Sequence, residues 1–281
     1  MSVVVSVIVP EGVVFAADSA STLQGAAPGQ TPGVLKIYDT TTKLIQLKDY
    51  PVAVATWGAG SMGARNVISY VEEFENRLPS YQDVAQSLNV SQTAADLRQF
   101  LKGKYDEQGL EQKPKGQRPE IGFVVGGYSA DKFFSDLLTF SLPHGDCREA
   151  RPYAGGAPNF GANWFGITEA ITRLHHGCDD RFYEVLKRLG VADEVLQKAR
   201  ILSQTELQYP IAFNAMPLQD AVAYAEYLVN VVIGRFRFTL GPPLCGGPID
   251  IASIKKKEGL LWVQRKRLQI RERLEGANYE R

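Results

Sequence analysis

The chain opens with two apolar segments separated by a tight turn, and this pattern limits the possible folds more than any other feature. Val3 to Val9 is β-branched at all but one position, and Val13 to Asp18 follows the turn Pro10-Glu11-Gly12. An apolar run without a polar face predicts a strand that is buried on both sides. If the two strands pair as a hairpin around Glu11, Asp18 returns beside residues 2 to 4. Ser2 and Asp18 would then meet at one end of a sheet.

Length and charge narrow the class of protein. The 281 residues, 44% of them hydrophobic, suit one large domain or two small ones. Of these we adopt a single domain over 1–281, with a helical insertion at about 179–217 and a basic C-terminal tail at about 264–281. Basic and acidic residues balance at 31 each, so charge favours neither nucleic acid nor a membrane surface as a partner. No apolar run approaches the ~20 residues of a membrane span.

The cysteines and the N-terminus indicate the compartment. Cys147, Cys178 and Cys245 are an odd number spread along a long chain, which is not a disulfide framework and favours a reducing environment. The N-terminal apolar stretch has no basic region before it, and the turn at Pro10 interrupts it early. We therefore expect no secretory signal, a mature chain that starts at or next to Met1, and a cytoplasmic location.

Strand and helix signals are grouped rather than alternating one by one. This grouping favours an α+β protein over a parallel doubly wound fold. The segment 22–33, rich in Gly and Pro, is expected to be a loop. Predicted strands after the first hairpin are 43–47, 52–57, 121–128, 137–142, 148–153, 249–254 and 260–263. Predicted helices are 61–78, 94–105, a block at 164–207 broken near Gly177 and Gly190, and 221–235.

Several segments together resemble a known family. The segment from Gly12 to Thr22 is similar to the second strand of proteasome β-subunits and their bacterial peptidase relatives, which are N-terminal-nucleophile (Ntn) hydrolases. In that family an Asp follows the nucleophile by sixteen positions, as Asp18 follows Ser2. Three further segments resemble the family's next strand, its glycine-rich turn and its Ser-Gly-Gly segment. They are Lys43-Leu44-Ile45-Gln46-Leu47, Gly58-Ala59-Gly60-Ser61 and Cys245-Gly246-Gly247.

The resemblance implies a four-layer αββα sandwich and a peptidase. Ser2 would be the nucleophile after removal of Met1, and its α-amine would be the base, because an α-amine has a pKa near ~7.7–8.0. Lys43 would favour the ionised hydroxyl, Asp18 would hold Lys43, and the Gly58 N–H would face the oxyanion. On this basis we expect Lys43→Ala to reduce turnover more than Asp18→Asn.

The resemblance also implies the partners. Peptides or unfolded proteins would be substrates, the chain would form a homo-oligomeric ring, and a separate AAA+ ATPase would unfold proteins for it. We expect no cofactor and no metal. The pair His175-His176 is followed by Gly177 and has no second cluster of ligands, so it predicts a helix end.

Residues that support the active site in the family are replaced in this chain, which leaves a second function open. Pro242 stands where the family has an Asp, and Cys245 where it has a Ser. A further family Ser is missing from the region of Ala157, where Asn159 or Thr239 would have to substitute. A catalytically inactive ring or scaffold subunit is therefore the alternative to an active peptidase.

A third reading comes from the spacing of glycines in 58–63. Gly58-Ala59-Gly60-Ser61-Met62-Gly63 matches the GxGxxG fingerprint of dinucleotide-binding proteins. That fingerprint should open a βαβ unit. The predicted helix is instead followed by Leu78-Pro79-Ser80 and another helical stretch, so dinucleotide binding is a remote alternative.

Overall fold

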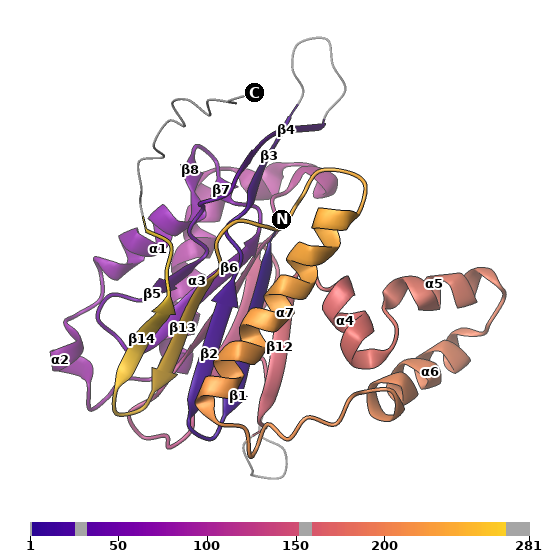
Figure 1. Cartoon of the computed structure of the whole chain (residues 1–281). Coiled ribbons are helices and arrows are strands. Elements are labelled where there is room, and N and C mark those ends of the chain that lie inside the picture. Colours follow the sequence, from indigo (N-terminus) through magenta and orange to yellow (C-terminus); the bar gives the residue numbers. More distant parts are fainter. Residues whose placement is uncertain (1, 26–32, 152–158, 268–281) are drawn as a thin grey trace, which may run out of the picture.

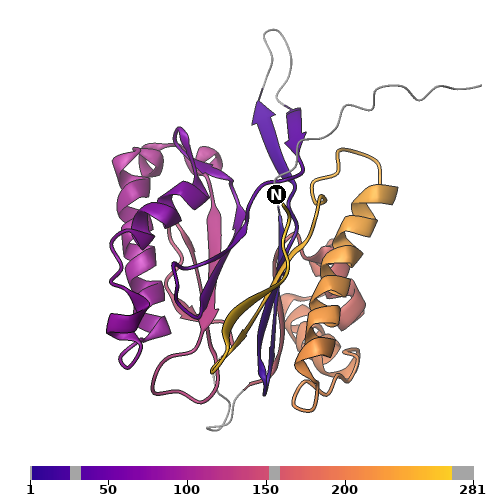
Figure 2. The same ribbon diagram turned by 60° about the vertical axis from the view of Figure 1, so that its left-hand side comes forward.

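Two five-stranded sheets pack face to face, with helices on both outer faces (Figure 2). The computed structural model describes residues 2–25, 33–151 and 159–267. Within these residues, every pair of neighbouring strands is antiparallel. The protein is therefore of mixed α and β class, with its strands and helices grouped along the chain as the sequence pattern predicts.

The first sheet has the strand order β12-β1-β2-β13-β14. Its strands span, in that order, Gly161–Gly166, Val3–Val9, Gly12–Ala17, Asp250–Lys255 and Gly259–Gln264. The second sheet has the order β11-β10-β9-β6-β5. Its strands span Arg148–Glu149, Asp136–Leu142, Ile121–Gly127, Val52–Gly58 and Leu44–Gln46. Two small hairpins complete the strands: β3 (Ser21–Gly25) with β4 (Gly33–Tyr38), and β7 (Ser61–Met62) with β8 (Arg65–Asn66).

Seven α-helices lie in the described residues (Figure 1). They are α1 (Val67–Glu75), α2 (Tyr81–Val84), α3 (Val90–Glu107), α4 (Glu169–His176), α5 (Asp180–Arg188), α6 (Asp193–Glu206) and α7 (Leu218–Phe238). Short 3-10 helices occupy Leu110–Gln112 and Lys115–Gln117. None of the described helices is both long and apolar enough to cross a membrane.

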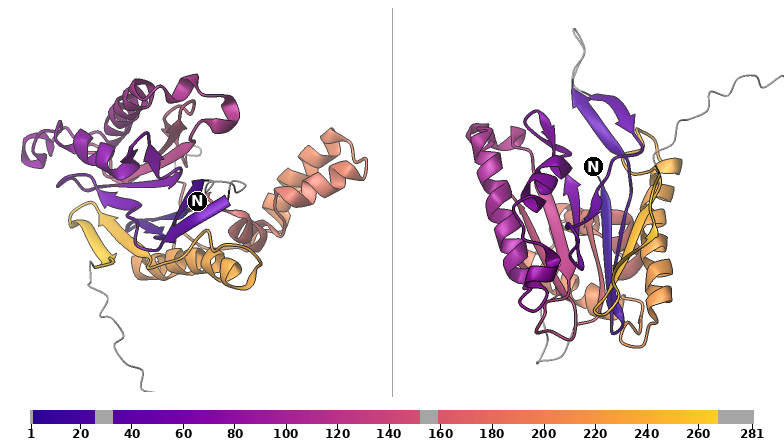
Figure 3. Two further views of the ribbon diagram at one scale, coloured as in Figure 1. Left: turned by 90° about the horizontal axis from the view of Figure 1, so that it is seen from above. Right: turned by 90° about the vertical axis from the view of Figure 1, so that its left-hand side faces the viewer.

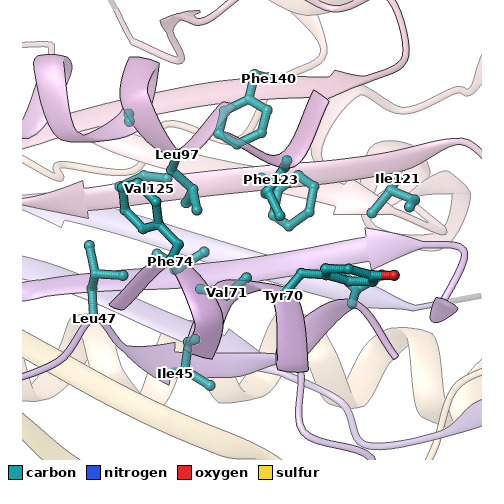
Figure 4. Close-up of a cluster of buried hydrophobic side chains, with 14 of the residues drawn as sticks. Ile45, Leu47, Tyr70, Val71, Phe74, Leu97, Ile121, Phe123, Val125 and Phe140 are labelled. Atoms are coloured by element: carbon teal, nitrogen blue, oxygen red, sulfur yellow. The ribbon is translucent and has the colours of Figure 1, made fainter. Parts of the chain in front are cut away.

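The alternation of side chains along each strand produces three apolar layers. In β1, Val3, Val5, Val7 and Val9 pack with α7, whereas Val4 and Ile8 pack between the two sheets. In β9, Ile121, Phe123 and Val125 pack under α1 and α3, while Val124 faces the other sheet. Figure 4 shows the cluster between these helices and the second sheet. Burial on both faces explains why β1 reads as a continuous apolar run.

Several predicted boundaries are wrong. The segment 22–33 is not simply a loop, because β3 and β4 pair across it; residues 26–32 lie outside the described residues. The predicted helix at 61–78 begins only at Val67, where Asn66 caps it by accepting from Ser69 N. Trp164 belongs to β12 and not to a helix, because alternate residues of 161–166 face opposite sides of the sheet.

The segment 179–217 leaves the body of the molecule. It contains α5 and α6, which project away from the sheets before the chain returns to α7 (Figure 1; Figure 3). The predicted strand 148–153 is reduced to β11 in the described residues, and 152–153 lie outside them. Of the basic tail, 264–267 are described; Lys266 forms an ion pair with Asp250 and is not a freely solvated charge.

Candidate functional site

The register of the first hairpin fixes the position of Asp18. Val4 lies opposite Ala17, so Asp18 lies beside Val3 at the end of β2. The Asp18 N–H donates to the Val3 carbonyl at 3.3 Å, and the Val3 N–H donates to Asp18 Oδ1 at 2.9 Å. The carboxylate therefore lies against the backbone that immediately follows Ser2.

The Asp18 carboxylate accepts three further hydrogen bonds. Lys43 Nζ donates to Oδ1 at 2.7 Å, and the backbone N–H groups of Ala20 and Gly246 donate to Oδ2 at 3.2 and 3.1 Å. The Asp18 residue is 1% exposed. A carboxylate buried this deeply must be paired and hydrogen-bonded to remain charged. Asp18 therefore joins three separate parts of the chain at one point.

Lys43 is held at the start of β5 with its ammonium inside the protein. Its carbonyl accepts from the Thr56 N–H at 2.9 Å, which ties it to β6. Burial lowers the pKa of the Lys43 ammonium below its ordinary value, while the charge and hydrogen bond of Asp18 oppose this shift. The positive charge of Lys266, which pairs with Asp250, is a smaller cause that also lowers the pKa of Lys43.

Ser2 is buried and is positioned through its main chain. The Ile167 N–H donates to the Ser2 carbonyl at 2.8 Å, and Gly166 pairs with Val3 across β1 and β12. Gly166 has φ +85°, and a Cβ at this position would lie 2.0 Å from the Ser2 carbonyl oxygen. Only glycine fits here. The end of β12 therefore sets where Ser2 lies.

Gly166 and Ile167 were missed in the sequence, because the supporting residues were sought near Ala157. Residues 155–158 lie outside the described residues. Asn159 bonds to Arg151 and precedes Gly161, which pairs with Ile8 at the other end of β1. That end is about 16 Å along the strand from Gly166. Asn159 therefore does not lie beside Ser2 and cannot replace the family's Ser there. The sequence signal that could have revealed β12 is the pair of glycines, Gly161 and Gly166, that flank Ala162 to Phe165.

Gly58 ends β6 in a conformation that requires glycine. Its φ is +91°, and a Cβ would lie 2.3 Å from the Glu120 carbonyl oxygen. The next residue, Ala59, donates its N–H to that same carbonyl at 2.9 Å. By contrast, a Cβ on Gly60 would meet nothing closer than Ser21 Oγ at 3.4 Å. The tight turn at Gly58 is therefore built for close approach of two backbones.

The region after α7 contributes a backbone N–H group to the site rather than a charged side chain. Cys245 is 1% exposed, and burial followed by the charge of Asp18 raises the pKa of its thiol to about 12. The thiol is therefore neutral at physiological pH and is a poor nucleophile. Pro242 and Thr239 are exposed, so neither is buried beside Asp18. Gly246 supplies the useful group, its N–H on Asp18.

Two cavities meet at Ser2. The first, which we call the β10 cavity, has a volume of about 1030 Å³ and runs along the end of β10. The second, the α1 cavity, has a volume of about 950 Å³ and lies between the β3–β4 hairpin and α1. Both are lined by Ser2, Trp57, Gly58 and Glu120. The Trp57 ring stacks, with centroids 4.5 Å apart, on Phe165, which lines the β10 cavity beside it.

The structure thus brings Ser2, Asp18, Lys43 and Gly58 to one end of the two sheets. Ser2 lines both cavities, Lys43 lines the α1 cavity with it, and the carboxylate that pairs with Lys43 accepts from the Val3 N–H. Among the described residues no group of three or more His, Cys, Asp or Glu is placed to hold a metal ion. The GxGxxG segment ends an antiparallel strand and runs into β7, so it does not open the βαβ unit that the dinucleotide fingerprint needs.

Comparison with known proteins agrees with this architecture. No family model matches the chain, and no curated protein matches it. Among solved structures it is similar to Anbu (ancestral beta-subunit) from Yersinia bercovieri, with a TM-score of 0.52 and 16% sequence identity. The match covers 93% of this chain and 86% of that chain. This likeness shows the fold.

Proposed function

We propose that the chain is a proteasome-like Ntn hydrolase with a four-layer αββα sandwich, and that it hydrolyses peptide bonds with Ser2 as the nucleophile. The observation that carries this proposal is the buried Lys43–Asp18 pair, 2.7 Å between Nζ and Oδ1. Asp18 accepts from the Val3 N–H next to Ser2, and Lys43 lines the same cavity as Ser2. The similarity in fold to Anbu supports it.

Each proposed step uses a group of the site. After Met1 is removed, the Ser2 α-amine accepts the hydroxyl proton while Oγ bonds to the substrate carbonyl carbon. The positive charge of Lys43 favours the developing alkoxide, and the Gly58 N–H stabilises the oxyanion. The α-amine then gives its proton to the departing peptide amine as the C–N bond breaks. Water hydrolyses the resulting ester and restores the hydroxyl.

An inactive scaffold subunit is the second candidate. The exposed position of Pro242 and the neutral thiol of Cys245 favour it, because neither residue can orient the terminal amine by charge. The two functions differ in what they require of the N-terminus. Hydrolysis requires a free amine on Ser2, whereas a scaffold tolerates Met1.

We expect the purified chain to have lost Met1 and to cleave fluorogenic peptides. Intact-mass spectrometry measures the first property, and the release of fluorophore measures the second. A chain that begins at Ser2 and cleaves no peptide would favour the scaffold. A chain that retains Met1 and still turns over peptides would contradict the role of the α-amine as base.

We further propose that the chain assembles as a homo-oligomeric ring in the cytoplasm, takes peptides or unfolded proteins as substrates, and is served by a separate AAA+ ATPase. The projecting helices α5 and α6 support self-association, because large apolar side chains lie exposed along them. These side chains are Phe182, Val185, Leu189, Val195, Ile201 and Leu202.

We expect light scattering at micromolar concentration to give a mass several times that of one 31.0 kDa chain. Replacing the half-exposed Val185 and the more exposed Leu189 by lysine should reduce this mass, since charges at an apolar contact remain unpaired. Lys255→Ala, which breaks the surface pair with Glu258 away from α5 and α6, is the control and should leave the mass unchanged. A wild-type mass of one chain would contradict the ring.

A further inference from the structure

The α1 cavity has two kinds of wall. One wall, from β3, β4 and the segment between β4 and β5, presents hydroxyl groups such as those of Ser21, Thr41 and Thr42. The other wall is the start of α1, where Val67 and Ile68 face the cavity and Glu72 follows. The cavity therefore offers an apolar surface and, further along the same helix, a carboxylate.

The direction of α1 places the carboxylate away from Ser2. The Val67 N–H donates to the Gly60 carbonyl at 3.0 Å, so α1 begins next to the turn that follows Gly58. Ile68 and Glu72 are four residues apart and lie on one face of the helix, separated by about one turn, or 5.4 Å. A side chain that enters beside Ser2 thus meets Ile68 before it reaches Glu72.

The charge of the cavity is negative. Among the side chains that line it, all of which belong to described residues, Lys43 is the single cation, and it is paired with Asp18. Glu72 and Glu120 also line the cavity, and no ion pair involves either of them within the described residues. The neighbouring Glu73 differs, because it pairs with Arg65 at 2.7 Å and with Lys104 at 3.0 Å.

We propose that the α1 cavity binds a long cationic side chain, arginine or lysine, of the peptide substrate. The methylene stem packs on Ile68, and the charged head reaches Glu72, with Glu120 adding negative potential. A short or acidic side chain gains neither contact. This inference rests on the proposed function for its substrate class, but cation binding in the cavity is measurable without turnover.

The experiment compares two fluorescent peptides that differ only in arginine against citrulline, which has nearly the same shape without the charge. Binding is measured by fluorescence polarisation in a Ser2→Ala background, so that no peptide is cut. We expect the arginine peptide to bind about five- to tenfold more tightly, through a charge-assisted hydrogen bond in a partly enclosed cavity. Adding Glu72→Gln should remove this preference. Adding Glu73→Gln, the adjacent carboxylate outside the cavity, should preserve it.

The outcomes separate the two proposals. Equal affinities, no binding of either peptide, or a preference that survives Glu72→Gln would overturn the assignment of Glu72. Loss of the preference in Glu73→Gln to the same extent would do so as well, because the effect would then be general electrostatics. An intact preference in a protein whose wild-type form cleaves no peptide would instead contradict the hydrolase function and leave the cation site standing.

Discussion

Ser2→Ala is expected to abolish peptide hydrolysis without unfolding the protein. The hydroxyl is the proposed nucleophile, and removal of such a group costs at least about 10³-fold in turnover. The contacts that hold residue 2 are main-chain contacts, the Ile167 N–H on its carbonyl and the close approach of Gly166, so they survive the substitution. Release of fluorophore from peptides and the thermal midpoint Tm measure the two properties.

Ser6→Ala is the matched control for this experiment. Ser6 lies in the same strand, is fully buried, and its Oγ has no hydrogen-bond partner in the described structure. Removing an unpaired buried hydroxyl is neutral or stabilising, so activity and Tm should both be retained. Wild-type turnover in Ser2→Ala would show that the nucleophile lies elsewhere.

The proximity of Ser2 and Asp18 was predictable because it depends on local pairing. A short turn between two arms of similar length fixes the hairpin register, and the register brings residue 18 back to residue 3. Burial of both faces was predictable from the run of valines for the same reason. Lys43 and Gly58 were identified by resemblance to the family and not by geometry.

The supporting contacts were not predictable, because they join distant parts of the chain through backbone atoms. Nothing in the composition of 161–166 indicates that Gly166 pairs with Val3. The Gly246 N–H on Asp18 is likewise independent of side-chain identity. The exposed hairpin of β3 and β4 lacks the apolar alternation that marks a half-buried strand, so its Gly and Pro content read as a loop.

For stability, the structure predicts the opposite order of the two variants from the one expected for turnover. Each Asp18 carboxylate oxygen accepts from two N–H donors, so either orientation of an asparagine amide at position 18 would turn its NH₂ group towards two donors. The substitution would also leave Lys43 buried without its counter-charge. Breaking a buried pair in this way costs about 3–5 kcal/mol. In Lys43→Ala the Asp18 carboxylate keeps three backbone donors. We therefore expect Asp18→Asn to lower Tm by about 10 °C, and by more than Lys43→Ala, although both variants lose turnover.

The dependence of stability on pH should separate the two variants. Burial already lowers the pKa of Lys43 from its ordinary 10.5, and loss of Asp18 removes the interaction that opposes this shift. A lysine whose pKa is lower in the folded state binds fewer protons there than in the unfolded chain, so the free energy of unfolding rises with pH towards 10.5. The stability deficit of Asp18→Asn relative to wild type should therefore shrink between neutral pH and pH 10. Lys43→Ala lacks the buried lysine, so its deficit should not shrink in this range. Denaturant unfolding at a series of pH values measures this; parallel curves for the two variants would show that Lys43 is not the buried charge left unpaired.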